Sequence, residues 1–303
     1  MNRRVIQIAK STQLISLPRK WAQQHHIKKG DELEITENGA KLVISIGKPE
    51  ERDKMVVRLP TAEKFLQRPL ANIYRRGYDE VTILFSDPSV TQLISKQIEN
   101  MLGFEIIEQS EGKVTLHMVA SALDSEFESV FRRLFLMVAV MTKDIADATS
   151  NGNFAKLEEI KNRERTNDKL TMFCQRLLNK RGYPQDPRRA PMLYETVCQL
   201  EYIGDDLRDI CRFLLKNKKC GKETEQLLFG LNELTSILYN LYFKYDISQL
   251  VKFKEKKESV QKEGLKILSR QKSTDSITAH YVLDAMDKLH HITEDIVTED
   301  LQQ

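Results

Sequence analysis

The segment Gln199–Asp209 reads QLEYIGDDLRD and lies within a long run of helical periodicity. It carries a glycine, which costs about 1 kcal/mol relative to alanine inside a helix. It also carries four acidic residues, whose like charges repel one another. Both features need an explanation beyond helix formation. At 100° per residue, the large apolar residues of the same helix form one core-facing seam: Leu200, Ile203, Leu207 and Leu214.

The acidic residues of this segment divide into two groups. Glu201 and Asp205 are four residues apart and project from one side of the helix, beside the apolar seam. Gly204 lies between the seam and these carboxylates, where the missing Cβ lets a neighbouring helix or a ligand approach closely. Asp206 and Asp209 lie farther round the helix, and we expect them to be solvated.

A second pair, Glu164 and Asp168, has the same spacing one helix earlier. If the two helices are antiparallel neighbours, four carboxylates come together and raise one another's pKa values. A hard cation relieves this repulsion because it prefers oxygen ligands. The alternative is that both pairs are solvated, or that nearby arginines neutralise them: Arg163, Arg165 and Arg208.

Residues 121–303 read as helix with short breaks, which predicts an all-α domain. Helices of this length without intervening strands favour two up-down three-helix bundles. The predicted helices are 122–150, 153–181, 189–217, 222–245, 247–271 and 276–301.

Residues 52–119 predict a small α/β domain of order β-α-β-α-β-β. Neither a G-x-G-x-x-G fingerprint nor a P-loop occurs in the chain, so we expect a scaffold or dimerisation role for this domain. The predicted strands are 55–59, 81–85, 104–108 and 113–119, and the predicted helices are 62–76 and 90–102.

Residues 1–48 predict short strands, a helix that begins at Pro18, and a hairpin turn at Asn38-Gly39. A unit of this size with one tryptophan buries little core, so we expect it to dimerise. Residues 1–50 hold nine basic and five acidic residues, a net charge of +4, whereas the whole chain carries +3. This concentration of positive charge indicates an anionic partner.

Two motifs in this region, KSTQLISLPRKW (10–21) and IKKGDEL (27–33), resemble the AbrB/SpoVT-type domain. The resemblance implies a swapped-hairpin β-barrel formed by two chains, often a DNA-binding one. The alternative is a dimerisation module whose basic face is solvated, and the chain has Ala22 and Gln23 where the family's transcription factors often carry arginines. The resemblance implies these phosphate-contacting residues: Arg3, Arg4, Lys10, Arg19 and Lys20.

The motifs LEYIGDDLRDIC (200–211) and RERTNDKL (163–170) resemble the helix signatures of the PhoU family, which regulates phosphate uptake. The resemblance implies two tandem three-helix repeats that bind a metal ion. We expect iron or zinc, with magnesium or manganese as the alternatives. In the second repeat, Asp287 and His291 align with the signature's acids, while His290 replaces its glycine. The implied metal ligands are Glu164, Asp168, Glu201, Asp205, Asp287 and His291.

The remaining features limit the class of protein. The longest apolar run, Leu134–Met141, is far shorter than the roughly 20 residues of a membrane span, and the first residues do not resemble a signal peptide. We therefore expect a cytoplasmic protein. The cysteines form no C-x-x-C pair, which indicates reduced thiols.

We expect a phosphate-responsive DNA-binding transcriptional regulator with a metal-binding PhoU-type domain. The alternative is a regulator that binds a phosphate ABC transporter ATPase or a sensor kinase without binding DNA. A di-iron enzyme would need E-x-x-H motifs, which the chain lacks. We expect no enzyme activity.

Overall fold

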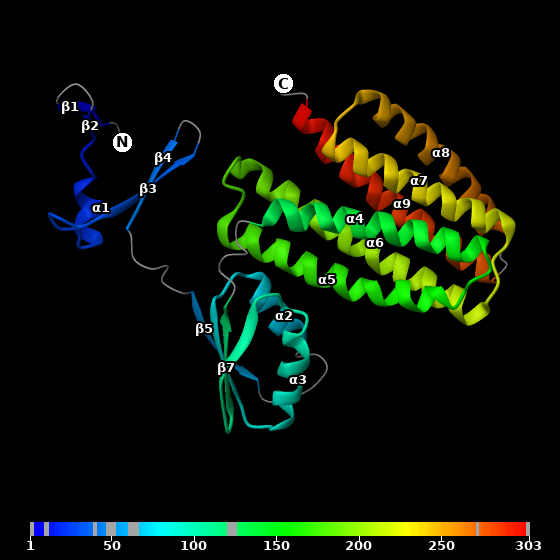
Figure 1. Cartoon of the computed structure of the whole chain (residues 1–303), viewed down its shortest axis with the longest axis horizontal. Helices are drawn as coiled ribbons and strands as arrows, with labels where there is room; N and C mark the ends of the chain where they lie inside the picture. Colours follow the sequence, from blue (N-terminus) through cyan, green and yellow to red (C-terminus); the bar gives the residue numbers. More distant parts are fainter. Residues whose placement is uncertain are drawn as a thin grey trace. The chain divides into compact units, whose positions relative to one another are not determined.

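The computed structural model describes residues 3–8, 12–38, 41–46, 53–59, 67–119, 126–270 and 273–300. It divides into two compact units, Met1–Glu51 and Arg52–Gln303. The second unit contains both the predicted α/β region and the predicted helical region, drawn from blue at β5 through cyan and green to red in Figure 1.

The N-terminal unit consists of two hairpins and a short helix. Strand β1 (Ile6–Ile8) pairs antiparallel with β2 (Thr12–Leu14), helix α1 (Arg19–Gln24) follows, and β3 (Leu33–Asn38) pairs antiparallel with β4 (Lys41–Ile46). Several large apolar side chains of this unit are exposed. These side chains are Val5, Ile6, Ile8, Leu14, Ile15, Ile35 and Leu42.

The α/β region begins the second unit and has the predicted order of strands and helices. Its sheet has the order β5-β6-β8-β7, in which β5 runs parallel to β6 and the other pairs are antiparallel. Alternate residues of β6 are buried (Val81, Ile83 and Phe85), as for a strand with one covered face. The elements are β5 (Lys54–Leu59), α2 (Gln67–Arg75), β6 (Glu80–Phe85), α3 (Ser89–Ile98), β7 (Phe104–Ser110) and β8 (Lys113–Met118).

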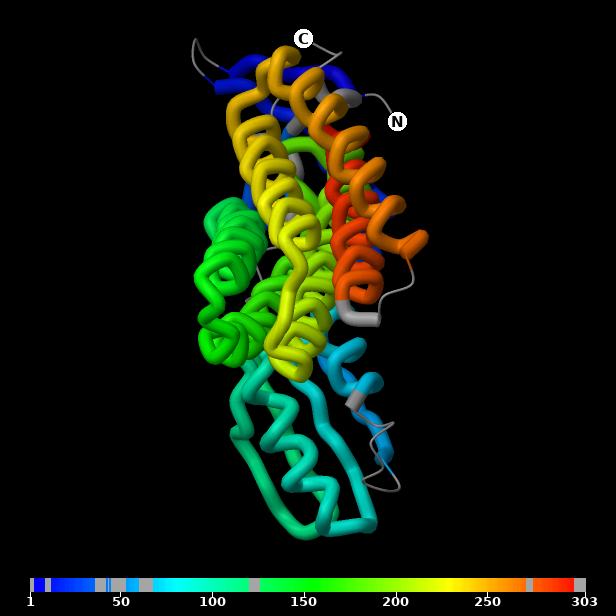
Figure 2. The backbone as a smooth tube through the Cα atoms, turned by 90° about the vertical axis from the view of Figure 1, so that its right-hand side faces the viewer, coloured from blue at the N-terminus to red at the C-terminus, as the bar shows by residue number. Residues whose placement is uncertain are grey.

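The helical region contains the six predicted helices, and they share one hydrophobic core. Helix α6 lies at its centre and packs against α4, α5 and α9, while α7 packs against α4, α8 and α9 (Figures 1 and 2). The predicted seam is correct, because Leu200, Ile203, Leu207 and Leu214 are all fully buried. The helices are α4 (Phe127–Ser150), α5 (Lys156–Arg181), α6 (Ala190–Asn217), α7 (Lys222–Phe243), α8 (Ile247–Ser269) and α9 (Ser273–Asp300).

Among the described residues, no helix is long and apolar enough to cross a bilayer. The four cysteines are free thiols, as expected.

The α/β region is fixed to helix α5 by a buried arginine. Arg176 is 1% exposed, and its guanidinium donates to the carbonyl oxygens of Tyr74 (3.0 Å) and Tyr78 (2.8 Å). It also donates to the Asp79 carboxylate at 2.8 Å, and the Lys180 ammonium donates to the same carboxylate at 2.6 Å. A buried charge with this many partners holds its neighbours in one arrangement.

The turn after α2 lies directly against α5. Gly77 has a φ of +94°, and a Cβ there would lie 2.9 Å from the Cβ of Lys180. Glycine meets both demands, since it adopts positive φ and allows close backbone approach. The α/β region and the bundle therefore meet at a contact that leaves no room for a larger residue.

Replacement of Arg176 by alanine leaves Asp79 and two carbonyl groups short of a buried partner. We expect the free energy of unfolding to fall by about 3–5 kcal/mol, the cost of breaking a buried ion pair from one side. Urea denaturation followed by circular dichroism measures it. Arg165→Ala removes an exposed arginine from the same helix and should change stability by no more than about 0.5 kcal/mol. Equal effects of the two variants would contradict this role of Arg176.

Candidate metal site

Helices α5 and α6 approach closely at Gly204. A Cβ on this residue would lie 2.5 Å from Nδ2 of Asn167, which belongs to α5. Asn167 is fully buried, and its Nδ2 donates to the carbonyl oxygen of Leu200 at 3.3 Å. The expected close approach is therefore confirmed, and a neighbouring helix makes it.

This approach brings carboxylates from the two helices together. Oxygens of Glu164, Asp168 and Asp205 lie within 4.8 Å of one another. Glu164 is buried, and the other two are half-buried. Three carboxylates at this separation are a suitable donor set for a hard divalent or trivalent cation. We call these three residues the carboxylate cluster.

The fourth predicted ligand, Glu201, lies beside the cluster and contacts the α/β region. Its Oε1 is 3.4 Å from Nη2 of Arg75 at the end of α2. Burial raises the pKa of Glu201, while the positive charge of Arg75 opposes that rise. Arg75 is 126 positions away in sequence, so no local pattern connects it with the site.

Asp168 is the most strongly perturbed member of the cluster. Burial is the main reason that its pKa rises to about 8, and the charges of Glu164, Glu201 and Asp205 raise it further. These effects favour the protonated form of Asp168 when no cation is bound. A cation at the site would have to displace this proton, which couples metal binding to pH.

Arg208 supplies a positive charge to the cluster. Its Nη1 donates to both Glu164 and Asp205, and its Nε lies 3.4 Å from Asp209. Arg163 instead pairs with Asp144 at 2.6 Å and with Glu159 at 2.8 Å. Arg208 therefore contacts the carboxylate cluster, whereas Arg163 pairs with other acids. A bound cation would compete with the Arg208 guanidinium for the oxygens of Glu164 and Asp205.

The expectation that Asp206 is solvated is wrong. Its side chain is buried and accepts a hydrogen bond from Nζ of Lys288 on α9 at 2.6 Å. Burial raises its pKa to about 7, although Lys288 lowers it. Helix α9 covers this side of α6, which the periodicity of one helix does not reveal. Asp209 is half-buried and contacts Arg208 and Arg212.

The predicted ligands of the second repeat lie on the surface of α9. Asp287 and His291 are exposed, and Nδ1 of His291 is 3.9 Å from the carboxylate of Glu294. Within the described parts of the chain, neither belongs to a group of three or more potential ligands. A metal site at this position stays a prediction.

The predicted DNA-contacting residues belong to the N-terminal unit. Arg3 and Arg4 precede β1 and are exposed, and Arg19 and Lys20 are exposed in the first turn of α1. Lys10 lies outside the described residues. The four described side chains are thus accessible to an anionic partner, and their role stays a prediction.

The raised pKa of Asp168 predicts a pH-dependent stability in the presence of a chelator. The folded protein binds this proton more tightly than the unfolded chain does. The proton therefore contributes fully to the free energy of unfolding below about pH 4, and this contribution is lost as the pH rises through about 8. Asp168→Asn should flatten this part of the profile in urea denaturation between pH 4 and 8. Glu195→Gln, an exposed change on α6, should leave it intact. An unchanged slope in Asp168→Asn would contradict the assignment.

Comparisons with known proteins match different parts of the chain. Residues 6–54 match the family described as antidote-toxin recognition MazE, a bacterial antitoxin. Among solved structures, the chain is similar to the phosphate transport system regulatory protein PhoU from Streptococcus pneumoniae, with 17% identity and a TM-score of 0.40. That alignment covers 58% of this chain and 91% of the other. The comparison with curated proteins finds no match. The family match covers the two N-terminal motifs that resemble the AbrB/SpoVT-type domain.

Proposed function

We propose that the protein is a DNA-binding transcriptional regulator of phosphate uptake whose helical region binds a metal ion. The observation that carries the DNA-binding proposal is the N-terminal unit. Its residues match a MazE-type domain over 6–54, and it exposes the basic side chains of Arg3, Arg4, Arg19 and Lys20. Exposed arginine and lysine side chains contact DNA phosphates and displace counterions.

A dimer is part of this proposal. One chain leaves the apolar residues of its short hairpins exposed, and a second copy would cover them. Two copies would also double the number of basic side chains presented to the duplex, which strengthens salt-dependent binding.

The carboxylate cluster supports the metal-binding part of the proposal. Glu164, Asp168 and Asp205 supply oxygen donors from two helices, and Glu201 is positioned to join them if it leaves Arg75. These donors suit iron, zinc, magnesium or manganese. The link to phosphate rests on the PhoU-like motifs in α5 and α6.

Selection of bound fragments from genomic DNA by the full-length protein tests the DNA-binding proposal. We expect enrichment of sequences upstream of phosphate-transport genes, and we expect the variant that lacks residues 1–48 to lose this binding. Retained sequence-selective binding without residues 1–48 would contradict the proposal. Absence of DNA binding, with capture of a transporter ATPase or a sensor kinase, would favour the alternative regulator.

A double variant of α1 tests the phosphate contacts directly. Arg19→Ala with Lys20→Ala should weaken DNA binding and reduce the slope of log affinity against log salt by about 2 per chain, because each lost phosphate contact removes about 0.9. Lys28→Ala with Lys29→Ala removes the same charge from exposed positions of the same unit and should change the slope less. Equal slopes for both double variants would show that charge alone matters.

A further inference from the structure

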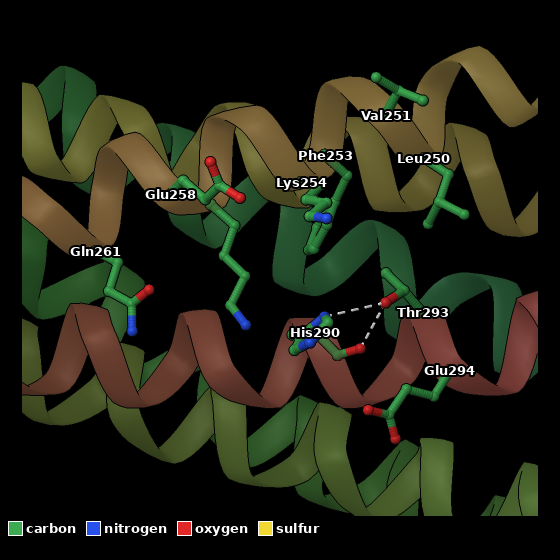
Figure 3. Close-up of a pocket in the computed structure, with 10 residues that line it drawn as sticks. Leu250, Val251, Phe253, Lys254, Glu258, Gln261, His290, Thr293 and Glu294 are labelled. Atoms are coloured by element: carbon green, nitrogen blue, oxygen red, sulfur yellow. Dashed lines mark hydrogen bonds between the residues drawn. The ribbon is translucent and has the colours of Figure 1, made fainter.

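A groove lies between helices α8 and α9, on the second three-helix repeat. Its volume is about 660 Å³, within the range of roughly 300–1,000 Å³ that is typical of binding sites. Leu250, Val251 and Phe253 line it from α8, and His290 and Thr293 line it from α9 (Figure 3). Thr293 donates a hydrogen bond to the carbonyl oxygen of His290 at 2.6 Å. The groove shares no residue with the carboxylate cluster.

The two repeats pack differently at corresponding positions. In the first repeat, Gly204 of α6 gives Asn167 of α5 room to fill the space between the helices. In the second repeat, the corresponding position of α9 carries His290, whose side chain is too large for such an approach. Helices α8 and α9 instead come close near Gly264, where an added Cβ would lie 2.6 Å from Leu283. Along α8, the groove extends from Leu250 to Gln261, which lies three residues before Gly264.

Apolar side chains continue along α8 beyond the groove. Val251 is 54% exposed, and Ile247, one turn earlier, is 59% exposed. Ile247, Leu250, Val251 and Lys254 share one face because they follow i, i+3, i+4 and i+7 spacing. From Ile247 to Gln261 this face extends about 21 Å at 1.5 Å per residue. A helix of about four turns covers that length.

The wall formed by α8 is basic. This helix has six lysines and three glutamates, a net charge of +3. Lys254 and Lys257 line the groove, and within the described part of the chain neither has an ion pair, whereas Lys256 pairs with Glu233. Glu294, on the α9 wall, contacts His291. Glu258 of α8 also lines the groove, so its lining contains two ammonium groups and two carboxylates around an apolar floor. The ammonium groups of Lys254 and Lys257 are the ones that can pair with carboxylates of a partner.

We infer that the groove between α8 and α9 binds an acidic amphipathic helix of a partner protein. The apolar face of such a helix would lie on Leu250, Val251 and Phe253, as helices do in other hydrophobic grooves. Glutamates beside that face would pair with Lys254 and Lys257. This inference depends neither on DNA binding by the N-terminal unit nor on metal binding by the carboxylate cluster.

Fluorescence anisotropy with the full-length protein tests the inference. The probe is a labelled helical peptide of about 15 residues, with leucines at i, i+3, i+4 and i+7 spacing and glutamates beside them. A second peptide carries lysines in place of the glutamates. We expect the acidic peptide to bind more tightly. We expect Lys254→Glu with Lys257→Glu, and separately Val251→Glu, to weaken its binding about tenfold or more, the effect of about 1.4 kcal/mol.

Matched variants on α8 control for charge and exposure. Lys252→Glu with Lys262→Glu makes the same change of charge at exposed positions outside the groove. Leu265→Glu alters a residue that is 54% exposed, as Val251 is. Neither control should weaken binding more than about twofold, less than about 0.5 kcal/mol.

Three results would overturn the inference. In the first, the native protein binds neither peptide. In the second, the groove variants and their controls bind the acidic peptide equally. In the third, dodecanoate binds, Val251→Glu abolishes this binding, and the peptide does not bind. This result would identify the groove as a site for a small amphiphile.

Discussion

The contact between Gly204 and Asn167 fixes the distance between α5 and α6, and the candidate site depends on that distance. A Cβ at position 204 would lie 2.5 Å from Nδ2 of Asn167, so even alanine requires the Asn167 side chain or the helices to shift. At the observed approach, carboxylates of both helices share a space of less than 5 Å. The contact also explains why a glycine that weakens the helix is useful at this position.

Two arginines connect the α/β region to this part of the bundle. Arg176 anchors Tyr74, Tyr78 and Asp79 on α5, and Arg75 at the end of α2 contacts Glu201. The α/β region thus contributes to the environment of the carboxylates, beyond the scaffold role expected from its sequence.

Local patterns in the sequence predict much of this structure. Helical periodicity identifies the six helices and the seam through Leu200 and Leu207, and i, i+4 spacing identifies both carboxylate pairs. Contacts between distant segments are not visible in such patterns. Asp206 is buried because α9 places Lys288 against it, and Glu201 is drawn towards Arg75. The second repeat keeps the spacing of the acids, but His290 prevents the approach that Gly204 allows.

The most direct test of this account is metal binding by Gly204→Ala, which retains all four carboxylates. Titration with zinc or iron(II), followed by calorimetry, should show an affinity at least about tenfold weaker than that of the native protein, a loss of about 1.4 kcal/mol. Gly230→Ala creates a similar clash between α7 and α8, 2.7 Å from Val260, and should bind metal as the native protein does. Native affinity in Gly204→Ala, with its helix content unchanged, would contradict the claim that this close approach assembles the site.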